Sequence, residues 1–133
     1  MQGTNHRVVL VVVNASAPIP VHDHPGSYAV QLLLSGTIKI SHYELCKEGQ
    51  GGLVRLKRNR VSTLQGGDVD YVNKKENIHC VESLTKNAVM LNVQRLSRIN
   101  AGKSWYFPSM VIGNKGHYWH RVRMDRSKVS EHY

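Results

Sequence analysis

The stretch VHDHPGSYAVQLLLSGTIKI, residues 21–40, decides the fold of this chain. Its second half contains two apolar segments, residues 28–34 and 37–40, on either side of Ser35-Gly36. Apolar segments around a short glycine turn are typical of a β-hairpin. Pro25-Gly26, just before the hairpin, indicates another tight turn. The stretch therefore predicts two paired strands that follow a sharp reversal of the chain.

The same stretch contains His22-Asp23-His24. In an extended strand, residues i and i+2 point the same way, so two imidazoles converge on one side while Asp23 faces the other. Imidazole is a common ligand of iron, zinc, copper and nickel. A third histidine, His79, lies in a later strand-like segment after Gly66-Gly67. Because a jelly roll brings sequence-distant strands together, His79 is predicted to complete a set of three metal ligands.

Short β-branched or alternating segments continue along the chain, and helical periodicity is nearly absent. Such a pattern predicts an all-β sandwich or barrel. We expect a tight turn at Arg58-Asn59-Arg60, between two of the strands. The expected strands are residues 7–13, 28–34, 37–45, 53–57, 61–64, 68–72, 78–84, 88–96, 104–107 and 117–124.

Length and composition indicate one soluble globular domain. With 133 residues, 41% of them hydrophobic, the chain can bury one core. We expect a single domain over residues 1–133, with a metal-binding core at about 7–96 and C-terminal strands with a polar tail at 97–133. No window of about 18 apolar residues and no secretory signal is present, which predicts a cytoplasmic protein without a membrane span.

The formal net charge is +9. Basic residues at strand spacing, such as Arg55 with Lys57, favour a solvated sheet face that also discourages edge pairing. Nucleic-acid binding needs an aromatic platform or a known motif besides charge, and we do not expect it. Cys46 and Cys80 are too few for a disulfide framework, and we expect both to be reduced. For the other five histidines we expect structural roles, with His42 on a surface hairpin: His6, His42, His117, His120 and His132.

Two motifs carry a family resemblance. Residues 21–40 resemble the first cupin motif, in the version found in the cysteine dioxygenase family. Residues 64–84, LQGGDVDYVNKKENIHCVESL, resemble that family's second motif through Tyr71, Asn73, His79, Val81 and Glu82. The resemblance implies a cupin double-stranded β-helix, a jelly-roll barrel. It also implies Fe(II) held by His22, His24 and His79, with zinc, nickel or manganese as alternatives, and oxidation of a thiolate to a sulfinate.

The chain also departs from that family. Met90, Asn92 and Gln94 stand where the resemblance implies a Ser-His-Tyr relay, so the catalytic groups are unknown. The upstream arginine that clamps an amino-acid carboxylate has no counterpart, although Arg7 is a candidate substitute. Strand parity and family position predict that five residues bind the substrate: Arg7, Val11, Ala29, Asn92 and Gln94.

Two functions remain open from the sequence. The first is a thiol dioxygenase-like oxygenase acting on a small thiol or another small anion. The alternative is a non-catalytic small-molecule-binding or sensory cupin that has lost the relay. Fold-level analogy also suggests a homodimer paired through a strand edge.

Overall fold

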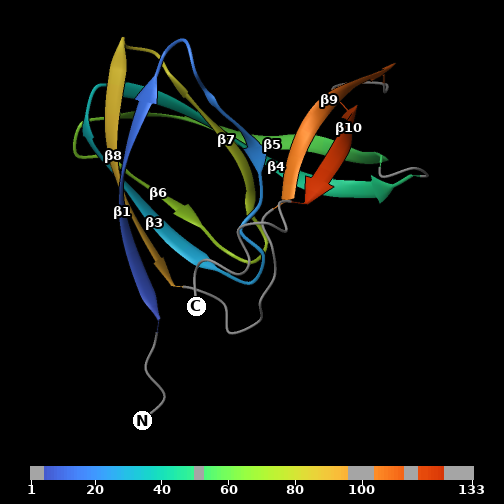
Figure 1. Cartoon of the computed structure of the whole chain (residues 1–133), viewed down its shortest axis with the longest axis horizontal. Coiled ribbons are helices and arrows are strands. Elements are labelled where there is room, and N and C mark those ends of the chain that lie inside the picture. Colours follow the sequence, from blue (N-terminus) through green and yellow to red (C-terminus); the bar gives the residue numbers. More distant parts are fainter. Residues whose placement is uncertain (1–4, 50–52, 96–103, 113–116, 125–133) are drawn as a thin grey trace.

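The computed structural model describes residues 5–49, 53–95, 104–112 and 117–124, and beyond Phe107 it describes the backbone alone. These residues form only strands and connections (Figure 1). No helix in the described ranges is long and apolar enough to cross a membrane. The strands are β1 His6–Asn14, β2 Ile19–His22, β3 Tyr28–Ser35, β4 Thr37–Glu48, β5 Leu53–Gln65, β6 Val69–Val72, β7 Ile78–Ser83, β8 Asn87–Arg95, β9 Ser104–Ile112 and β10 His117–Met124.

The strands form two antiparallel sheets that pack as a sandwich. One sheet has four strands in the order β1-β8-β3-β6. The other has the order β10-β5-β4-β7-β2-β9 and closes on itself, because β9 pairs with both β10 and β2. In Figure 1 the β9–β10 pair extends the second sheet away from the sandwich, beside β4 and β5. The all-β jelly-roll prediction is confirmed.

The main core lies between the two sheets, and alternation along each strand determines which side chains enter it. From the four-stranded sheet come Val13, Leu33 and Met90, each at most 1% exposed. From the facing sheet come Ile38 and Ile40, both 0% exposed. A second cluster fills the closed part of the larger sheet, and it contains Val54, Leu56, Ile78 and Tyr106.

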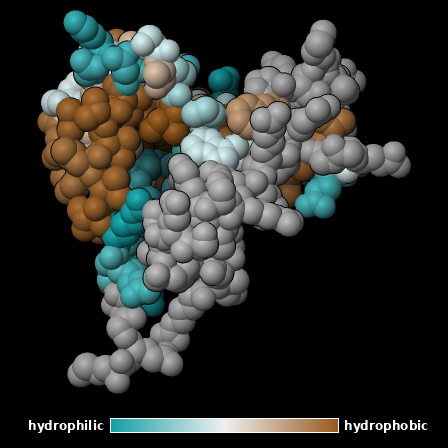
Figure 2. Space-filling view, viewed as in Figure 1, coloured by the Kyte–Doolittle hydropathy of each residue, from teal (hydrophilic) through white to brown (hydrophobic). Residues whose placement is uncertain are grey.

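The outer side of the four-stranded sheet is apolar as well. Figure 2 shows hydrophobic residues gathered over the part of the molecule where Figure 1 places β1, β8, β3 and β6. Val8, Leu10 and Val12 on β1 are each more than 60% exposed. The strands of this sheet therefore have the near-continuous apolar sequence that is typical of strands buried on both faces. The outer face of the sheet is nevertheless open to solvent.

The turn predicted at Arg58-Asn59-Arg60 is wrong, because β5 runs unbroken from Leu53 to Gln65. His42 pairs with Arg60 and Tyr43 pairs with Arg58, which leaves Asn59 as an extra residue opposite this step of β4. Such an irregularity is a β-bulge, which bends and twists a strand without reversing it. A polar interruption of an apolar pattern produces the same sequence signal as a tight turn.

The predicted hairpin at Ser35-Gly36 is confirmed, and its glycine is required for two reasons. Gly36 has φ of 82°, which strains any residue with a Cβ. A Cβ there would also lie 2.7 Å from the Asn87 carbonyl oxygen and 2.9 Å from the Ala88 Cα. The hairpin therefore packs its backbone directly against the start of β8.

Replacing Gly36 by alanine should destabilise the fold by more than backbone strain alone. Gly67 is a matched control, because its φ is 94° and a Cβ there would meet nothing within 4 Å. We expect Gly67→Ala to cost about 1 kcal/mol and Gly36→Ala roughly 2–4 kcal/mol of unfolding free energy. Urea denaturation of both variants measures the difference. Equal losses would show that the close approach to β8 is unimportant.

Candidate metal centre

The two histidines of the first motif lie where β2 ends and the chain turns. β2 ends at His22, so His24 lies beyond the strand rather than within it as the sequence suggested. The Ser27 N–H donates to the His24 carbonyl at 3.1 Å, and Gly26 has φ of 66°. Proline second and a positive-φ glycine third are typical of a type II turn. The turn fixes the backbone of His24, and the two imidazoles still point to the same side.

The third histidine reaches these two through strand pairing. His79 on β7 lies opposite His22 on one side and opposite His42 of β4 on the other. The same row of the sheet continues from His22 to Trp105 on β9. Three neighbouring strands thus present imidazoles at one level of the sheet, and the turn adds His24.

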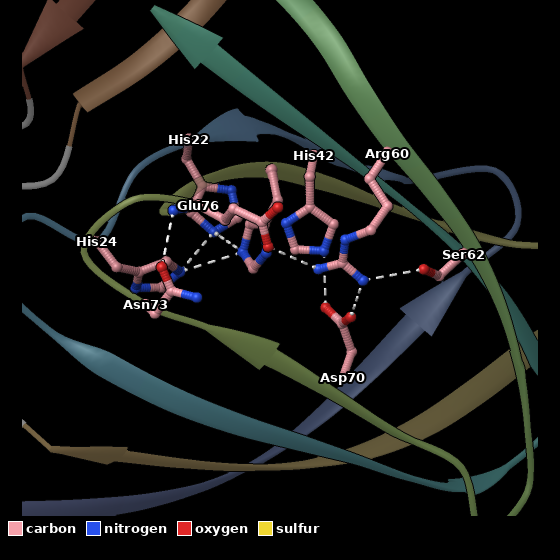
Figure 3. A network of polar contacts seen from close by, with 9 residues as sticks. His22, His24, His42, Arg60, Ser62, Asp70, Asn73 and Glu76 are labelled. Carbon is pink, nitrogen blue, oxygen red and sulfur yellow. Dashed lines mark hydrogen bonds and ion pairs between the residues drawn. The ribbon is translucent and has the colours of Figure 1, made fainter.

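The rings of His22 and His24 lie side by side (Figure 3), and the ring of His79 approaches both of them. Their Nε2 atoms lie 3.0 Å (His22–His24), 3.2 Å (His24–His79) and 3.1 Å (His22–His79) apart. All three residues are buried, with exposures of 4%, 6% and 0%. The structure thus brings together the three histidines that the two motifs predicted.

This arrangement fits a divalent metal ion. The Nδ1–H of His22 donates to the Pro20 carbonyl at 2.8 Å, which leaves the lone pair of Nε2 directed at the other two rings. With metal–nitrogen bonds of about 2.1 Å, right angles between ligands give N···N distances of about 3.0 Å, whereas tetrahedral angles give about 3.4 Å. The observed triangle is closer to the right-angled set. Because neutral imidazoles carry no charge, a ferrous ion bound by three of them would keep its full positive charge.

Asp23 fastens the histidine segment to β9. Its Oδ1 accepts the Ser104 N–H at 2.7 Å, and its Oδ2 accepts the Tyr106 hydroxyl at 2.9 Å. The Asp23 N–H donates in turn to the Ser104 carbonyl at 3.1 Å. Burial and the neighbouring Asp23 carboxylate raise the pKa of Tyr106 far above its ordinary value, so this hydroxyl remains a donor. Asp23 therefore faces away from the two imidazoles, as the sequence predicted, and holds their segment to β9.

The expectation that His42 lies on a surface hairpin is wrong. His42 is 0% exposed, and its ring centroid is 5.7 Å from that of His79. Its Nε2 lies 2.8 Å from Asp70 Oδ2 on the opposite sheet, so the two sheets are joined by a polar contact beside the three histidines. Alternation with polar neighbours along β4 gave no signal of this burial, because the partner comes from β6.

Arg60 extends the same network towards the surface. Its Nη1 donates to Asp70 Oδ1 at 3.0 Å, and its Nη2 donates to Glu76 Oε2 at 3.2 Å (Figure 3). Glu76 belongs to the turn in which Asn73 Oδ1 accepts the N–H groups of Lys75 and Glu76. Burial by itself raises the pKa of Asp70, but the hydrogen bonds and charges of His42 and Arg60 outweigh it and lower that pKa below its ordinary value. Asp70 is therefore a buried carboxylate held in its charged form.

Of the positions predicted to bind substrate, four lie on the inner face of the four-stranded sheet, where parity placed them. Ala29 and Asn92 are buried, and Val11 and Gln94 are partly buried. Arg7 pairs with Gln94 at the end of β1 and is exposed. Met90 belongs to the core between the sheets.

Sequence reasoning missed Gln31. It pairs with Asp70 on one side and with Asn92 on the other, and it is only 1% exposed. Gln31 Oε1 and Asn92 Oδ1 are both buried, and neither has a hydrogen-bond partner within the described ranges. A glutamine in the middle of the apolar run Tyr28–Leu34 was the available signal, because a buried amide in such a run needs a polar neighbour.

Cys80 directly follows His79 on β7, so strand alternation turns it away from the three histidines. Its Sγ lies 3.9 Å from the Tyr43 hydroxyl, near the second core cluster. Burial and the adjacent Cys80 raise the pKa of Tyr43 to about 12. Among the remaining histidines, the side chains of His117 and His120 and the whole of His132 lie outside what the structure describes, as does the polar tail from residue 125.

Together these features define a class: a small double-sheet β protein with a buried three-histidine metal centre. The family model PCO_ADO matches residues 2–95, and the chain belongs to this family of thiol dioxygenases of the cysteamine and cysteine type. The match supports the three-histidine thiol-dioxygenase part of the resemblance. It includes β8, so the family membership holds with Met90, Asn92 and Gln94 in place.

No curated protein matched the chain. Among solved structures, the cysteine peptidase Peruvianin-I from Thevetia peruviana latex is 15% identical with a TM-score of 0.54, over 68% of this chain and 50% of its own. A Bacillus subtilis oxalate decarboxylase is 24% identical with a TM-score of 0.53, over 72% of this chain and 23% of its own. The chain thus spans half or less of these relatives, and they confirm only the cupin fold.

Asp23→Asn should weaken metal binding while the fold is retained. An amide removes the charge that holds both Ser104 and Tyr106, so the His22–His24 segment loses part of its attachment to β9. We expect metal affinity to fall roughly 10- to 100-fold, as for other residues that orient ligands. Competition for Zn²⁺ or Fe²⁺ with a chromophoric chelator measures it. Asp68→Asn is the control, because Asp68 also accepts a backbone N–H, from Gln65, in a distant turn; equal effects of the two substitutions would contradict the role of Asp23.

Asp70→Asn should reduce stability in a pH-dependent way. A carboxylate with a lowered pKa stabilises the fold above its ordinary value of 3.8, and this stability is lost as the pH falls below 3.8 through the folded-state pKa. We expect the unfolding free energy of the variant to be roughly 1–3 kcal/mol lower than that of wild type at pH 7. This difference should disappear below about pH 4. Denaturant unfolding across pH measures this gap. Glu82→Gln breaks the exposed Lys39–Glu82 pair and should change little at any pH; a gap for Asp70→Asn that does not depend on pH would contradict the argument.

Proposed function

We propose that this protein is a thiol dioxygenase that oxidises the thiol of a small aminothiol to a sulfinate. The observation that carries the proposal is the buried triangle of Nε2 atoms from His22, His24 and His79 in a chain that belongs to the PCO_ADO family. In the reaction both atoms of dioxygen are transferred to the thiolate sulfur, whose four-electron oxidation balances the reduction of dioxygen. The reaction therefore needs no external reductant.

In this proposal His22, His24 and His79 hold ferrous iron. A bound ferrous ion would supply the redox chemistry that lets dioxygen react with a thiolate. The protein's own contribution is to fix the three imidazoles, through Asp23 and the His22–Pro20 contact, and to bury them away from bulk water. Since neutral imidazoles leave the charge of the metal uncompensated, the site favours the thiolate over the thiol.

The inner face of the four-stranded sheet supports an amino group as the second recognised feature of the substrate. Gln31 and Asn92 place two buried amide oxygens side by side in the row of the sheet that contains Asp70. Asp70 in turn contacts His42, which lies beside His79 on the neighbouring strand. Carbonyl oxygens accept hydrogen bonds from an amine or ammonium group. A carboxylate would need a cation, but Arg60 is already bound by Asp70 and Glu76, and Arg7 is exposed. Both points favour an aminothiol over a mercapto acid.

A second candidate is a cupin that binds a small molecule or senses it without turnover. It is favoured by one observation, the presence of Met90, Asn92 and Gln94 at the positions of the relay, since none of these side chains is an acid or base at neutral pH. Under this alternative the three-histidine site still binds metal, and a ligand stabilises the protein without being changed.

Oxygen uptake by the iron-loaded protein decides between the two candidates. With cysteamine, cysteine and 3-mercaptopropionate as substrates, we expect uptake of one dioxygen per thiol and a sulfinate product identified by mass spectrometry. Cysteamine should have the highest kcat/KM. His79→Ala should abolish uptake and lower the iron content, whereas Gln31→Leu and Asn92→Leu should raise KM for cysteamine about tenfold and leave iron content unchanged, since each loses one hydrogen bond.

The outcomes of this experiment are distinguishable. Uptake that is equal for all three thiols, or unaffected by Gln31→Leu, would refute the aminothiol while leaving the dioxygenase. One equivalent of bound iron without uptake, together with a thiol that raises the melting temperature, would favour the sensory candidate. Full iron binding by His79→Ala would refute the site itself.

A further inference from the structure

We propose that the outer face of the four-stranded sheet is the interface of a homodimer, in which two copies pack this face against each other. The inference is independent of the reaction, because this face lies on the opposite side of the sheet from Gln31 and Asn92. By strand alternation the outer apolar face consists of Val8, Leu10, Val12, Tyr28, Val30, Leu32, Leu34, Val69, Tyr71, Val89, Leu91 and Val93.

The residues of the outer apolar face form continuous rows across all four strands. One row runs Val8, Val93, Val30, Tyr71, and the next runs Leu10, Leu91, Leu32, Val69. No position in these rows carries a charge or a side-chain amide. A solvated antiparallel sheet normally alternates apolar and polar side chains, with the polar ones outward. Here the outward residues are apolar from one edge strand to the other, as in a sheet covered on both sides.

The exposed area matches what a dimer interface needs. Eight members of the outer apolar face are between 38% and 64% exposed, and they belong to the sheet over which Figure 2 shows hydrophobic residues gathered: Val8, Leu10, Val12, Tyr28, Val30, Leu34, Val69 and Tyr71. Exposed apolar side chains that extend over four adjacent strands form a patch on the order of the ~800 Å² that each partner contributes to a standard specific interface. The face is therefore large enough for a stable contact without further surface.

The distribution of charge around the face favours a second copy in an antiparallel orientation. His6 and Arg95 pair at one end of the strands, where Lys74 Nζ also lies 5.9 Å from the centre of the Tyr28 ring. The other end carries Asn14 and Asn87, whose side chains are hydrogen-bonded to each other at 3.0 Å. Two copies related by a twofold axis, with their strands antiparallel, place the end with His6, Arg95 and Lys74 of one copy away from the same end of the other. This arrangement keeps the two copies of that basic cluster apart, and aligned sheet packing accommodates it.

This interface differs from pairing through a strand edge. Edge pairing would use the backbone of β1 or β6, and it would leave the side chains of the inner strands β3 and β8 uncovered. Face packing buries exactly those inner side chains. Val30 on β3 therefore separates the two geometries, because it is 40% exposed and does not lie on an edge strand.

Sedimentation equilibrium of the full chain over a series of concentrations from the micromolar range upward tests the proposal. We expect wild type to reach twice its 15.0 kDa mass. Val30→Lys should raise the dissociation constant at least ~100-fold, because each dimer would then bury two unpaired ammonium groups. Leu10→Lys, at a position 61% exposed, is a second variant of the same kind. Val61→Lys is the matched control, since Val61 is 47% exposed on β5 of the other sheet, and it should dimerise as wild type does.

Circular dichroism and metal affinity should be unchanged in all three variants. The dimer should persist in about 1 M salt, where electrostatic contacts are screened within about 3 Å and the repulsion between two copies of charge +9 is weakened. A monomer at every concentration would overturn the proposal, and so would a dimer that Val30→Lys leaves intact or that salt dissolves. If a monomeric wild type bound vesicles of phosphatidylcholine and phosphatidylserine and Val30→Lys did not, the face would be assigned to a lipid surface instead.

Discussion

The attachment of the His22–His24 segment to β9 is the constraint on which the metal centre depends. Strand pairing alone aligns His22 with His79, but β2 ends there, and His24 follows in a turn. The two hydrogen bonds that the Asp23 carboxylate accepts from Ser104 and Tyr106 hold the segment to β9 beyond the end of the strand. Because Asp23 points away from the rings it flanks, one residue holds both neighbouring imidazoles without competing for the metal. The closed second sheet is thus part of the site, since it brings β9 within reach of Asp23.

A polar layer crosses the otherwise apolar sandwich at the level of the histidines. Arg60, His42, His79 and His22 follow one another across the larger sheet, and Asn92, Gln31 and Asp70 follow one another across the smaller one. The His42–Asp70 contact joins the two rows, and Arg60 neutralises the carboxylate. Burying this many polar groups is costly unless each finds a partner. The buried amide oxygens of Gln31 and Asn92 have no hydrogen-bond partner among the described residues, which is the physical reason why the proposed function places the amino group of the substrate beside them.

Local patterns in the sequence predicted the parts of this structure that depend on local geometry. The hairpin at Gly36, the common direction of His22 and His24 and the inward parity of Val11, Ala29 and Asn92 follow from turn chemistry and strand alternation, whereas His79 was predicted from the expected jelly roll and the family's second motif. The failures concern contacts between segments far apart in the chain. Asn59 resembles a turn residue until its register against β4 is known, and His42 resembles a surface residue until Asp70 of β6 is placed opposite it. Gln31 was missed for the same reason, because its polar neighbours lie on β6 and β8.

The two faces of the four-stranded sheet carry different kinds of side chains. The inner face carries amides at one level and large apolar side chains at the next, so it can both line a site and pack a core. The outer face carries only apolar side chains in its two complete rows, and these add nothing to the core of one copy. Val, Leu and Tyr favour strands whichever way they point, so propensity alone could explain some of them. It does not explain the absence of Thr, Lys or Glu from every outward position of four adjacent strands, because an exposed sheet gains solubility from such residues at little cost. A surface that stays covered after folding has no such need, and the homodimer proposed above would cover the whole face.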